Sequence, residues 1–485
     1  MIIKKLNQFP LIKIISKFIS KFIFIIGTIF FFIIIILSFY YFNSGMYERY
    51  KPPLLMEKIN DKIIYKYFGF DIYKIDSYIL NNLKSLKYLI FDNELENVVI
   101  KIDTENLYNL ELQRNDKLKG LSNKNAKFSR AKLNYNDNDY KIKLRVKGDR
   151  VLHWYDKDQT SYKIDLRGND RIWGLEEFSV QKPITRNYIY EYIFHKFLEF
   201  NNLISLKYFF VNLSINQNNH GIYAVEEGFS KELLVRNKKK NGPIFSLEEN
   251  LGVTYPNIEY DLYSKKFWFK NDPELTKKAL VKLNKLKLSQ ISINEIFDLE
   301  KWATYFAIID LTGNFHGSIP KSVKLYYNPV TFKFEPIGFD GHYNSDLFQD
   351  FLTIDFMDTE NKKCDYICSD REWYLKFLQL EDKGVNQEFV KIYLEKLKKV
   401  SSDNLIKDFL DQNLEKIIFF NNQFLSETSK KDKVLYKGMG LYLFDENYLL
   451  KRSKYVQKRL TEVEKKFSQK NLKIKKNLFL AKKNN

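Results

Sequence analysis

The order of strand and helix patterns along this chain limits its possible folds more than any other feature. Between residues 96 and 227, six segments alternate apolar and polar residues or are rich in β-branched and aromatic residues, as half-buried strands are. Helical spacing interrupts them at 105–120, closed by Gly120, and at 186–201. The predicted strands are residues 96–103, 139–148, 161–166, 178–181, 207–216 and 220–227.

Helical patterns dominate after residue 285. The exception is a hairpin-like pair at 322–329 and 333–340, turned at Asn328-Pro329. The sequence therefore predicts an α+β fold with a β-rich first half and a mainly helical second half. A two-lobed protein kinase, with a cleft between its lobes, has this layout.

The net charge of +19 lies mostly at the two ends of the chain. The first 21 residues hold five lysines and no acid, and residues 449–485 hold thirteen Lys or Arg against two Glu. Because the body between them is nearly balanced, a basic groove for nucleic acid is not indicated. We expect a basic helical tail at 431–485, for which anionic lipid head groups would be a natural partner.

Residues 22–42 form an apolar run without a single charge. At ~1.5 Å per helical residue, the run matches the hydrocarbon core of a bilayer. The five lysines before it predict a cytoplasmic N-terminus by the positive-inside rule. We therefore expect a single-pass membrane protein with residues 1–21 in the cytoplasm, 43–94 next to the membrane and the main domain outside the cytoplasm.

The two cysteines, Cys364 and Cys368, are four positions apart. This spacing fits one helical turn or a local disulfide, and their redox state stays open. No second pair accompanies them, so the sequence does not predict a zinc site.

The segment FEPIGFDGHYN, residues 334–344, has the pattern of a buried strand that ends abruptly on a carboxylate. Phe334 and Ile337 suit a strand interior, and Asp340 and Gly341 follow almost at once. Two interpretations are open at this point. Asp340 is part of a solvated turn, or it is held at the edge of a cleft.

Several blocks occur in a fixed order along the chain. They are KLRVKGDRVLHW, SYKIDL and WGLEEFSVQKPITRNYIYE, then YFFVNLSINQNNHGIYAVEEGFSKEL, then LTGNFHG and KLYYNPVTFKFEPIGFD. In this order, from about residue 95 to 350, they resemble the CotH kinase family, the spore-coat protein H type of atypical protein kinase. The resemblance implies a kinase domain over 95–430 that transfers phosphate from ATP to protein Ser or Thr with Mg²⁺ or Mn²⁺.

The resemblance assigns the nucleotide side of the site to the first half. Gly148, in RVKGDR, would let a turn cover the phosphates closely. Lys163 would reach the phosphates from its strand and pair with Glu191 on the helix 186–201. Arg186 is a rival phosphate ligand, because a guanidinium binds phosphate in bidentate fashion.

The remaining roles fall on acidic and amide side chains. Glu226 or Glu227 would face the nucleotide or the cleft, with Glu227 slightly favoured, although both could equally cap the following helix. Asp310 would be the catalytic carboxylate that orients the acceptor hydroxyl or takes its proton. Asp340 and Asn314 would bind the metal, since hard cations prefer oxygen ligands.

One departure from the family pattern keeps a second interpretation open. Many members have His-Asn before the strand at this place, whereas this chain has Lys321-Ser322. The alternative is a catalytically inactive pseudokinase or a cell-envelope scaffold.

Overall fold

The computed structural model describes residue 28 and, with gaps, residues 95–465. The chain divides into two compact units, residues 1–90 and 91–485, and every element described below belongs to the second. Apart from Thr28, the apolar run 22–42 lies outside the described residues, as do both cysteines. The internal gaps are 119–126, 149–152, 155–159, 248–258, 342–350, 358–369, 381–383 and 432–447.

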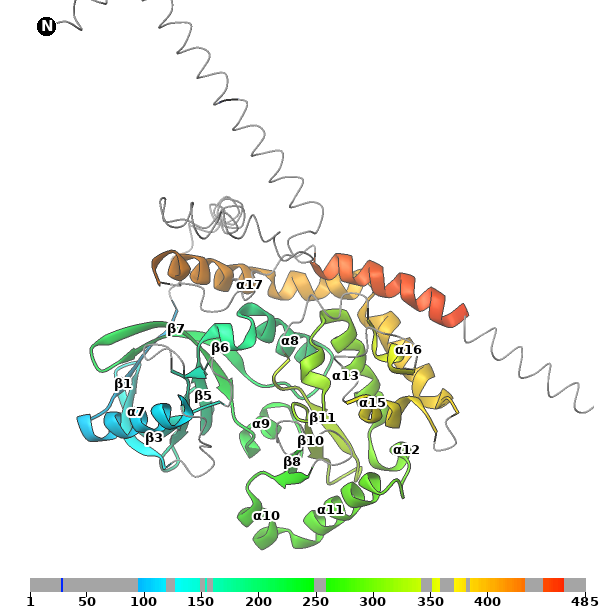
Figure 1. Cartoon of the computed structure of the whole chain (residues 1–485), viewed down its shortest axis with the longest axis horizontal. Helices are drawn as coiled ribbons and strands as arrows, with labels where there is room; N and C mark the ends of the chain where they lie inside the picture. Colours follow the sequence, from blue (N-terminus) through cyan, green and yellow to red (C-terminus); the bar gives the residue numbers. More distant parts are fainter. Residues whose placement is uncertain are drawn as a thin grey trace, which may run out of the picture. The chain divides into compact units, whose positions relative to one another are not determined.

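Seven strands close into a barrel in the first half of this unit (Figure 1). Their order around the barrel is β1-β2-β3-β4-β5-β7-β6, and parallel pairing of β1 with β6 closes it. Alternate residues such as Ile142, Leu144 and Val146 are buried in its apolar interior. The strands are β1 (Asn97–Lys101), β2 (Ser129–Tyr135), β3 (Asn138–Val146), β4 (Tyr162–Leu166), β5 (Glu177–Gln181), β6 (Tyr208–Ile215) and β7 (Asn218–Glu227).

The predicted α+β class is confirmed, and each of the six predicted strands is present with small shifts at its ends. The sequence missed β2 and the closure of the sheet. The β-rich half is a closed barrel rather than the expected β-rich lobe of a two-lobed kinase. Closure pairs β1 with β6, which lie more than a hundred residues apart in the chain.

Two helices accompany the barrel. The first, α7 (Thr104–Leu118), agrees with its prediction. The second, α8 (Ile189–Phe200), begins three residues later than predicted. A 3₁₀ turn, η4 (Pro183–Arg186), precedes it, and Asn187 and Tyr188 have φ angles of 54° and 56°. Because these positive φ values break the helical path, Arg186 lies in the turn and not on α8.

A second, smaller sheet has the strand order β11-β10-β8-β9. Its members are β8 (Ile244–Leu247), β9 (Tyr260–Leu262), β10 (Lys324–Tyr327) and β11 (Phe334–Ile337). The predicted hairpin is confirmed, since β10 and β11 pair antiparallel with Leu325 opposite Pro336. The chain leaves β11 only three residues before Asp340, so this sheet sets where that carboxylate lies.

Helices make up most of the remainder and share one large apolar core with α8. Helix α13 is buried along almost its whole length and packs against α16. The elements are α9 (Lys231–Arg236), α10 (Lys265–Asn271), α11 (Pro273–Lys287), α12 (Ile293–Ile296), α13 (Leu299–Thr312), η5 (Phe315–Ser318), η6 (Thr353–Met357), α15 (Arg371–Leu378), α16 (Gln387–Val400) and α17 (Asp403–Lys431).

The helical residues 448–465 belong to the same core. Leu449, Val456 and Leu460 are buried in it. The buried guanidinium of Arg452 donates from Nε to the carbonyl oxygen of Asp310 (2.8 Å), at the end of α13. This part of the expected basic tail is therefore built into the domain.

The expectation of a single-pass membrane protein is corrected by the structure. In the part of the chain that the structure describes, no helix has both the length and the apolar character needed to cross a bilayer. The longest one, α17, carries charged residues along its length, and every such charge opposes transfer into hydrocarbon.

Candidate functional site

A cluster of charged side chains gathers on the outer wall of the barrel. Because the interior is apolar, the polar residues at the ends of its strands face outward. Lys147 follows β3, Gln181 ends β5 and Glu226 lies near the end of β7. Arg186 comes from η4, and Asp340 follows β11 of the second sheet. The cluster therefore joins the barrel to the second half of the domain.

Arg186 lies between the two carboxylates of this cluster. Its Nε is 3.3 Å from Oε2 of Glu226, and its Nη1 is 2.8 Å from Oδ1 of Asp340. Glu226 also forms an ion pair with Lys147 and accepts a hydrogen bond from Nε2 of Gln181 (2.9 Å). Lys147 donates in turn to Oε1 of Gln181 (3.0 Å). Two cations and two carboxylates thus form one continuous network.

Burial and charge act in opposite directions on these groups. Burial raises the pKa of the Glu226 carboxyl, but the charges of Lys147 and Arg186 outweigh it and hold that pKa below its ordinary value. Burial lowers the pKa of Arg186, and the carboxylates of Asp340, Glu226 and Glu191 reverse this and raise it. Arg186 and Glu226 are therefore both charged at neutral pH, and the charge of each offsets the cost of burying the other.

Asp340 lies in a tight turn with a φ angle of 57°, a left-handed conformation that Asp tolerates better than most residues. The next residue, Gly341, donates its backbone N–H to both oxygens of Glu191, at 3.1 and 2.9 Å. His316, on η5, donates from Nδ1 to the backbone carbonyl oxygen of Asp340 (2.8 Å). The turn that presents Asp340 is thus held from two sides.

The environment of Asn314 indicates whether a metal ion or a phosphate fits beside the Asp340 turn. Its side chain is buried, yet neither its Oδ1 nor its Nδ2 has a hydrogen-bond partner among the described residues. A Cβ placed on Gly341 would come within 3.1 Å of its Nδ2, so Asn314 borders the Asp340 turn. A buried amide without partners is costly, and a ligand at this turn would satisfy it.

No three His, Cys, Asp or Glu side chains are grouped to hold a metal within the described ranges. This agrees with the chemistry of Mg²⁺, which one or two carboxylates commonly bind together with water and the phosphates of a substrate. Asp340, with the side chain of Asn314 bordering the same turn, fits that donor set.

The structure does not bring Lys163 and Glu191 together. Lys163 forms an ion pair with Glu177 on β5 (3.0 Å), whereas Glu191 contacts Gly341. Lys163 nevertheless shares a row of outward-facing residues with Glu226, since both are paired across the sheet with Ser179. The predicted pair is therefore wrong, but Lys163 lies on the barrel wall that carries the cluster.

Glu227, the predicted cleft residue, has a different environment from its neighbour Glu226. It forms an ion pair with Arg236 of α9 and accepts a hydrogen bond from the backbone N–H of Lys207 (2.7 Å). These contacts tie β7 to α9 and to the start of β6. Glu226, and not Glu227, is the acid that belongs to the cluster.

Gly148 follows Lys147 directly and has a φ angle of 89°. A Cβ at this position would come within 2.2 Å of the ring of His153, so only glycine fits. Its carbonyl oxygen accepts a hydrogen bond from the ammonium of Lys117. The residues after it, 149–152, are outside the described ranges, and a phosphate-covering role stays a prediction.

Asp310, the predicted catalytic carboxylate, is completely buried near the end of α13. Its Oδ1 accepts hydrogen bonds from the backbone N–H and the hydroxyl of Thr353, at 2.8 and 3.0 Å. Its Oδ2 accepts a hydrogen bond from the hydroxyl of Tyr393. These contacts give Asp310 a role in joining α13, η6 and α16, and they leave it no face toward an acceptor hydroxyl.

The buried position of Asp310 predicts a distinct pH dependence of stability. Burial raises its pKa to about 7, against hydrogen bonds from Tyr393 and Thr353 that lower it. Between pH 4 and 7, the folded state therefore keeps a proton on Asp310 that the unfolded state releases. The free energy of unfolding should fall by up to about 4 kcal/mol as pH rises over this range.

Urea unfolding at several pH values checks this prediction for the wild type and Asp310→Asn. As pH rises over that range, the free energy of unfolding of the wild type should fall relative to that of the variant. Parallel pH curves would contradict the assignment. Because Asp310 contacts no solvent-facing group, the properly folded variant should also keep any transferase activity of the wild type.

The sequence interpretation missed Lys147, Gln181 and Glu226 as members of one network. Lys147 could have been identified from the sequence, since it directly precedes Gly148 in a segment already singled out. Glu226 was named as an alternative to Glu227. Gln181 carried no signal of its own, because only the pairing of β5 with β7 places it beside Glu226.

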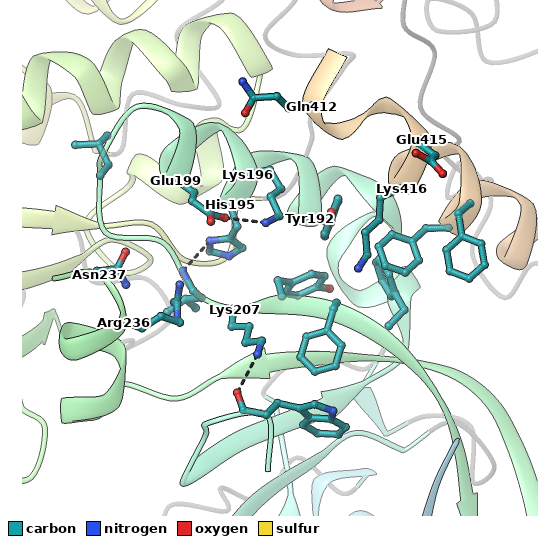
Figure 2. A pocket seen from close by; sticks show the side chains of 18 of the residues that line it. Tyr192, His195, Lys196, Glu199, Lys207, Arg236, Asn237, Gln412, Glu415 and Lys416 are labelled. Atoms are coloured by element: carbon teal, nitrogen blue, oxygen red, sulfur yellow. Dashed lines mark hydrogen bonds and ion pairs between the residues drawn. The ribbon is translucent and has the colours of Figure 1, made fainter. Parts of the chain in front are cut away.

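A separate cavity of about 1020 Å³ is lined by residues of α8, β6 and α17 (Figure 2). Tyr192, His195 and Lys196 of α8 line one wall, and Lys416 of α17 faces them. Aromatic and cationic side chains both contribute to the lining. The members of the charged cluster do not line it, but His195 contacts Glu191 (3.3 Å) and so connects it to the Asp340 turn.

Comparison with known protein families shows a match to this chain. The family described as CotH kinase protein matches residues 144–457, more than half of the chain. The matched range contains the barrel strands from the end of β3 onward, every residue of the charged cluster and the first part of the helix 448–465. Comparison with curated proteins found no match.

Proposed function

The chain belongs to the CotH kinase family, and from this premise we propose that it transfers phosphate from ATP to Ser or Thr of a protein with Mg²⁺ or Mn²⁺. One observation carries the proposal. The network of Lys147, Glu226, Arg186 and Asp340 borders Asn314, whose buried amide has no partner among the described residues. Positioning and charge neutralisation are the main needs of phosphoryl transfer, and such a network provides both.

The nucleotide side of the proposed site is the outer wall of the barrel. A row of cross-strand neighbours leads from Glu226 through Ser179 to Lys163 and Arg145. The two cations at its far end, with Arg186 at its near end, suit the phosphates of a bound nucleotide. Lys163 thus keeps its proposed role as a phosphate ligand, with Glu177 in place of Glu191 as its partner.

Asp340 and Asn314 would hold the metal ion. When bound, the ion supplies positive charge that neutralises the phosphates during transfer. The chain's own residues prepare for it: Gly341 and His316 hold the turn through hydrogen bonds, and Arg186 forms an ion pair with Asp340. The amide of Asn314 would gain the partner that it lacks among the described residues.

Nucleotide binding without transfer is a second candidate, favoured by the environment of Asp310. Its oxygens are taken by Thr353 and Tyr393, so it cannot act on an acceptor hydroxyl in this structure. A pseudokinase would keep the charged network and lack the catalytic carboxylate. The two candidates therefore agree on the binding site and differ only in the transfer step.

The transfer step can be tested on the full chain with γ-labelled ATP, Mn²⁺ and casein as a generic acceptor. Lys163→Met should lower the transfer rate by about 10–100-fold, because a charge-assisted hydrogen bond to phosphate contributes about 1.5–3 kcal/mol. Lys143→Met is the matched control, since Lys143 also lies on a barrel strand and pairs with an acid, Asp165 (3.2 Å). The control should transfer phosphate as the wild type does.

Each result decides between the candidates. Transfer that Lys163→Met reduces and Lys143→Met does not supports the kinase. If the wild type binds nucleotide but labels no protein, itself included, the pseudokinase replaces it. If the wild type does not bind ATP with either metal ion, both proposals fail.

A further inference from the structure

Glu191 is an unusual buried acid because its main partner is a backbone N–H. It lies in the first turn of α8 and is completely buried. Both of its oxygens accept from the N–H of Gly341, which directly follows Asp340. The contact spans 150 positions of the sequence and ties the start of α8 to the turn after β11.

His195, one helical turn further along α8, lies against this carboxylate. Its Nδ1 accepts a hydrogen bond from the backbone N–H of Leu206 (3.2 Å), so in the neutral ring the proton is on Nε2. That Nε2 lies 3.3 Å from Oε1 of Glu191. The carboxylate is therefore bound by the backbone of the Asp340 turn and has the imidazole of His195 next to it.

The turn has little freedom to settle elsewhere. A Cβ on Gly341 would meet Phe194 at 2.8 Å and both Asn314 and Glu191 at 3.1 Å. Phe194 and Glu191 both come from α8, and Asn314 follows α13. The backbone of Gly341 thus packs directly between the helix that carries Glu191 and the amide that borders the metal position.

We propose that Glu191 is a positioning residue for the metal ligands of this site. Its carboxylate, with His195 packed next to it, sets the backbone at Gly341 and through it the placement of Asp340 near Asn314. The inference rests on the proposed function, since it concerns the same metal position. It differs from the expected role of Glu191, which was to hold a lysine against the phosphates.

The test measures Mn²⁺ binding to the full chain in the presence of ATP, by the loss of the free-ion paramagnetic resonance signal, together with thermal unfolding. Glu191→Ala removes both acceptors and should weaken Mn²⁺ binding by about 10–100-fold, as outer partners of metal ligands do. Glu191→Gln keeps one acceptor and should lose less. Glu199→Gln is the control, on the same helix in an exposed ion pair with Lys196, and should bind Mn²⁺ normally.

His195 allows a second test, and its expected result would not occur if Glu191 only stabilised the fold. Its ring lines the 1020 Å³ cavity, so His195→Ala opens a space that added imidazole can reach from solvent (Figure 2). The variant should bind Mn²⁺ more weakly, and imidazole should restore binding. The wild type and Glu191→Ala should not respond to imidazole.

The outcomes distinguish a failure of the positioning role of Glu191 from a failure of the proposed function. Wild-type binding with unchanged affinity in Glu191→Ala overturns the positioning role and leaves the proposed function standing. If Glu191→Ala does not fold, an unaltered Glu191→Gln together with a failed imidazole rescue overturns it. A wild type that binds neither Mn²⁺ nor ATP removes the proposed function, and the positioning role with it.

Discussion

Replacing Asp340 by Asn should abolish metal-dependent nucleotide binding and phosphate transfer. The amide keeps the shape of the side chain and can still accept a hydrogen bond from Arg186, so the fold should survive. It loses the negative charge that a hard divalent cation requires. Because even the outer partners of metal ligands affect metal affinity by about 10–100-fold, the loss at a direct ligand should exceed about 100-fold.

Asp355 offers a control that closely matches Asp340. Its side chain is 12% exposed and pairs with Arg459, whereas that of Asp340 is 15% exposed and pairs with Arg186. Asp355→Asn should therefore lose a similar ion pair without losing metal-dependent binding. Calorimetric titration of both variants with ATP and Mg²⁺ gives the comparison. Equal nucleotide affinity in Asp340→Asn and the wild type would remove the metal assignment.

Replacing Glu226 by Ala should be among the most destabilising single changes in the domain. The substitution leaves the buried Arg186 and the partly buried Lys147 without their shared carboxylate and also removes the acceptor for Gln181. Removing one partner of a buried ion pair costs about 3–5 kcal/mol, since the remaining charge has lost both water and its partner. Urea unfolding at neutral pH measures the change.

Glu177→Ala provides the comparison on the adjacent barrel wall. Glu177 pairs with Lys163, and both side chains are partly exposed, so the loss should stay below about 1 kcal/mol. A loss of the same small size in Glu226→Ala would mean that solvent or Asp340 compensates the freed cations, and the network would then not hold the site together.

Local patterns were enough to predict most strands and helices of the domain. Alternation in KIKLRV and KIDL identifies β3 and β4 because one face of each strand fills the barrel interior. The closure was not predictable in this way, since β1 pairs with β6 across more than a hundred residues. The start of α8 was misplaced because positive φ angles at Asn187 and Tyr188 break a pattern that the sequence continues smoothly.

The sequence singled out two residues that the structure brings together, Asp340 and Arg186, but not all of their contacts. The abrupt end of FEPIGFD marked Asp340, and Arg186 was named as a rival phosphate ligand. The choice between Glu226 and Glu227 depends on which face of β7 is outward, and only the register of β5 with β7 decides that. Asp310 was expected to act on the acceptor hydroxyl. Nothing in the sequence of a helix-terminal acid indicates that Thr353 and Tyr393 enclose it.

The helical residues 448–465 have a consequence for how the domain is made. They supply Leu449, Val456 and Leu460 to the main core, and Arg452 caps carbonyl groups at Asp310 and Phe351. During synthesis, the elements that share this core must wait for these residues to leave the ribosome before their packing is complete. Until then, apolar surface on α13 and α16 stays open, so a chain stopped before residue 448 should be a substrate for chaperones and proteases rather than a smaller working domain.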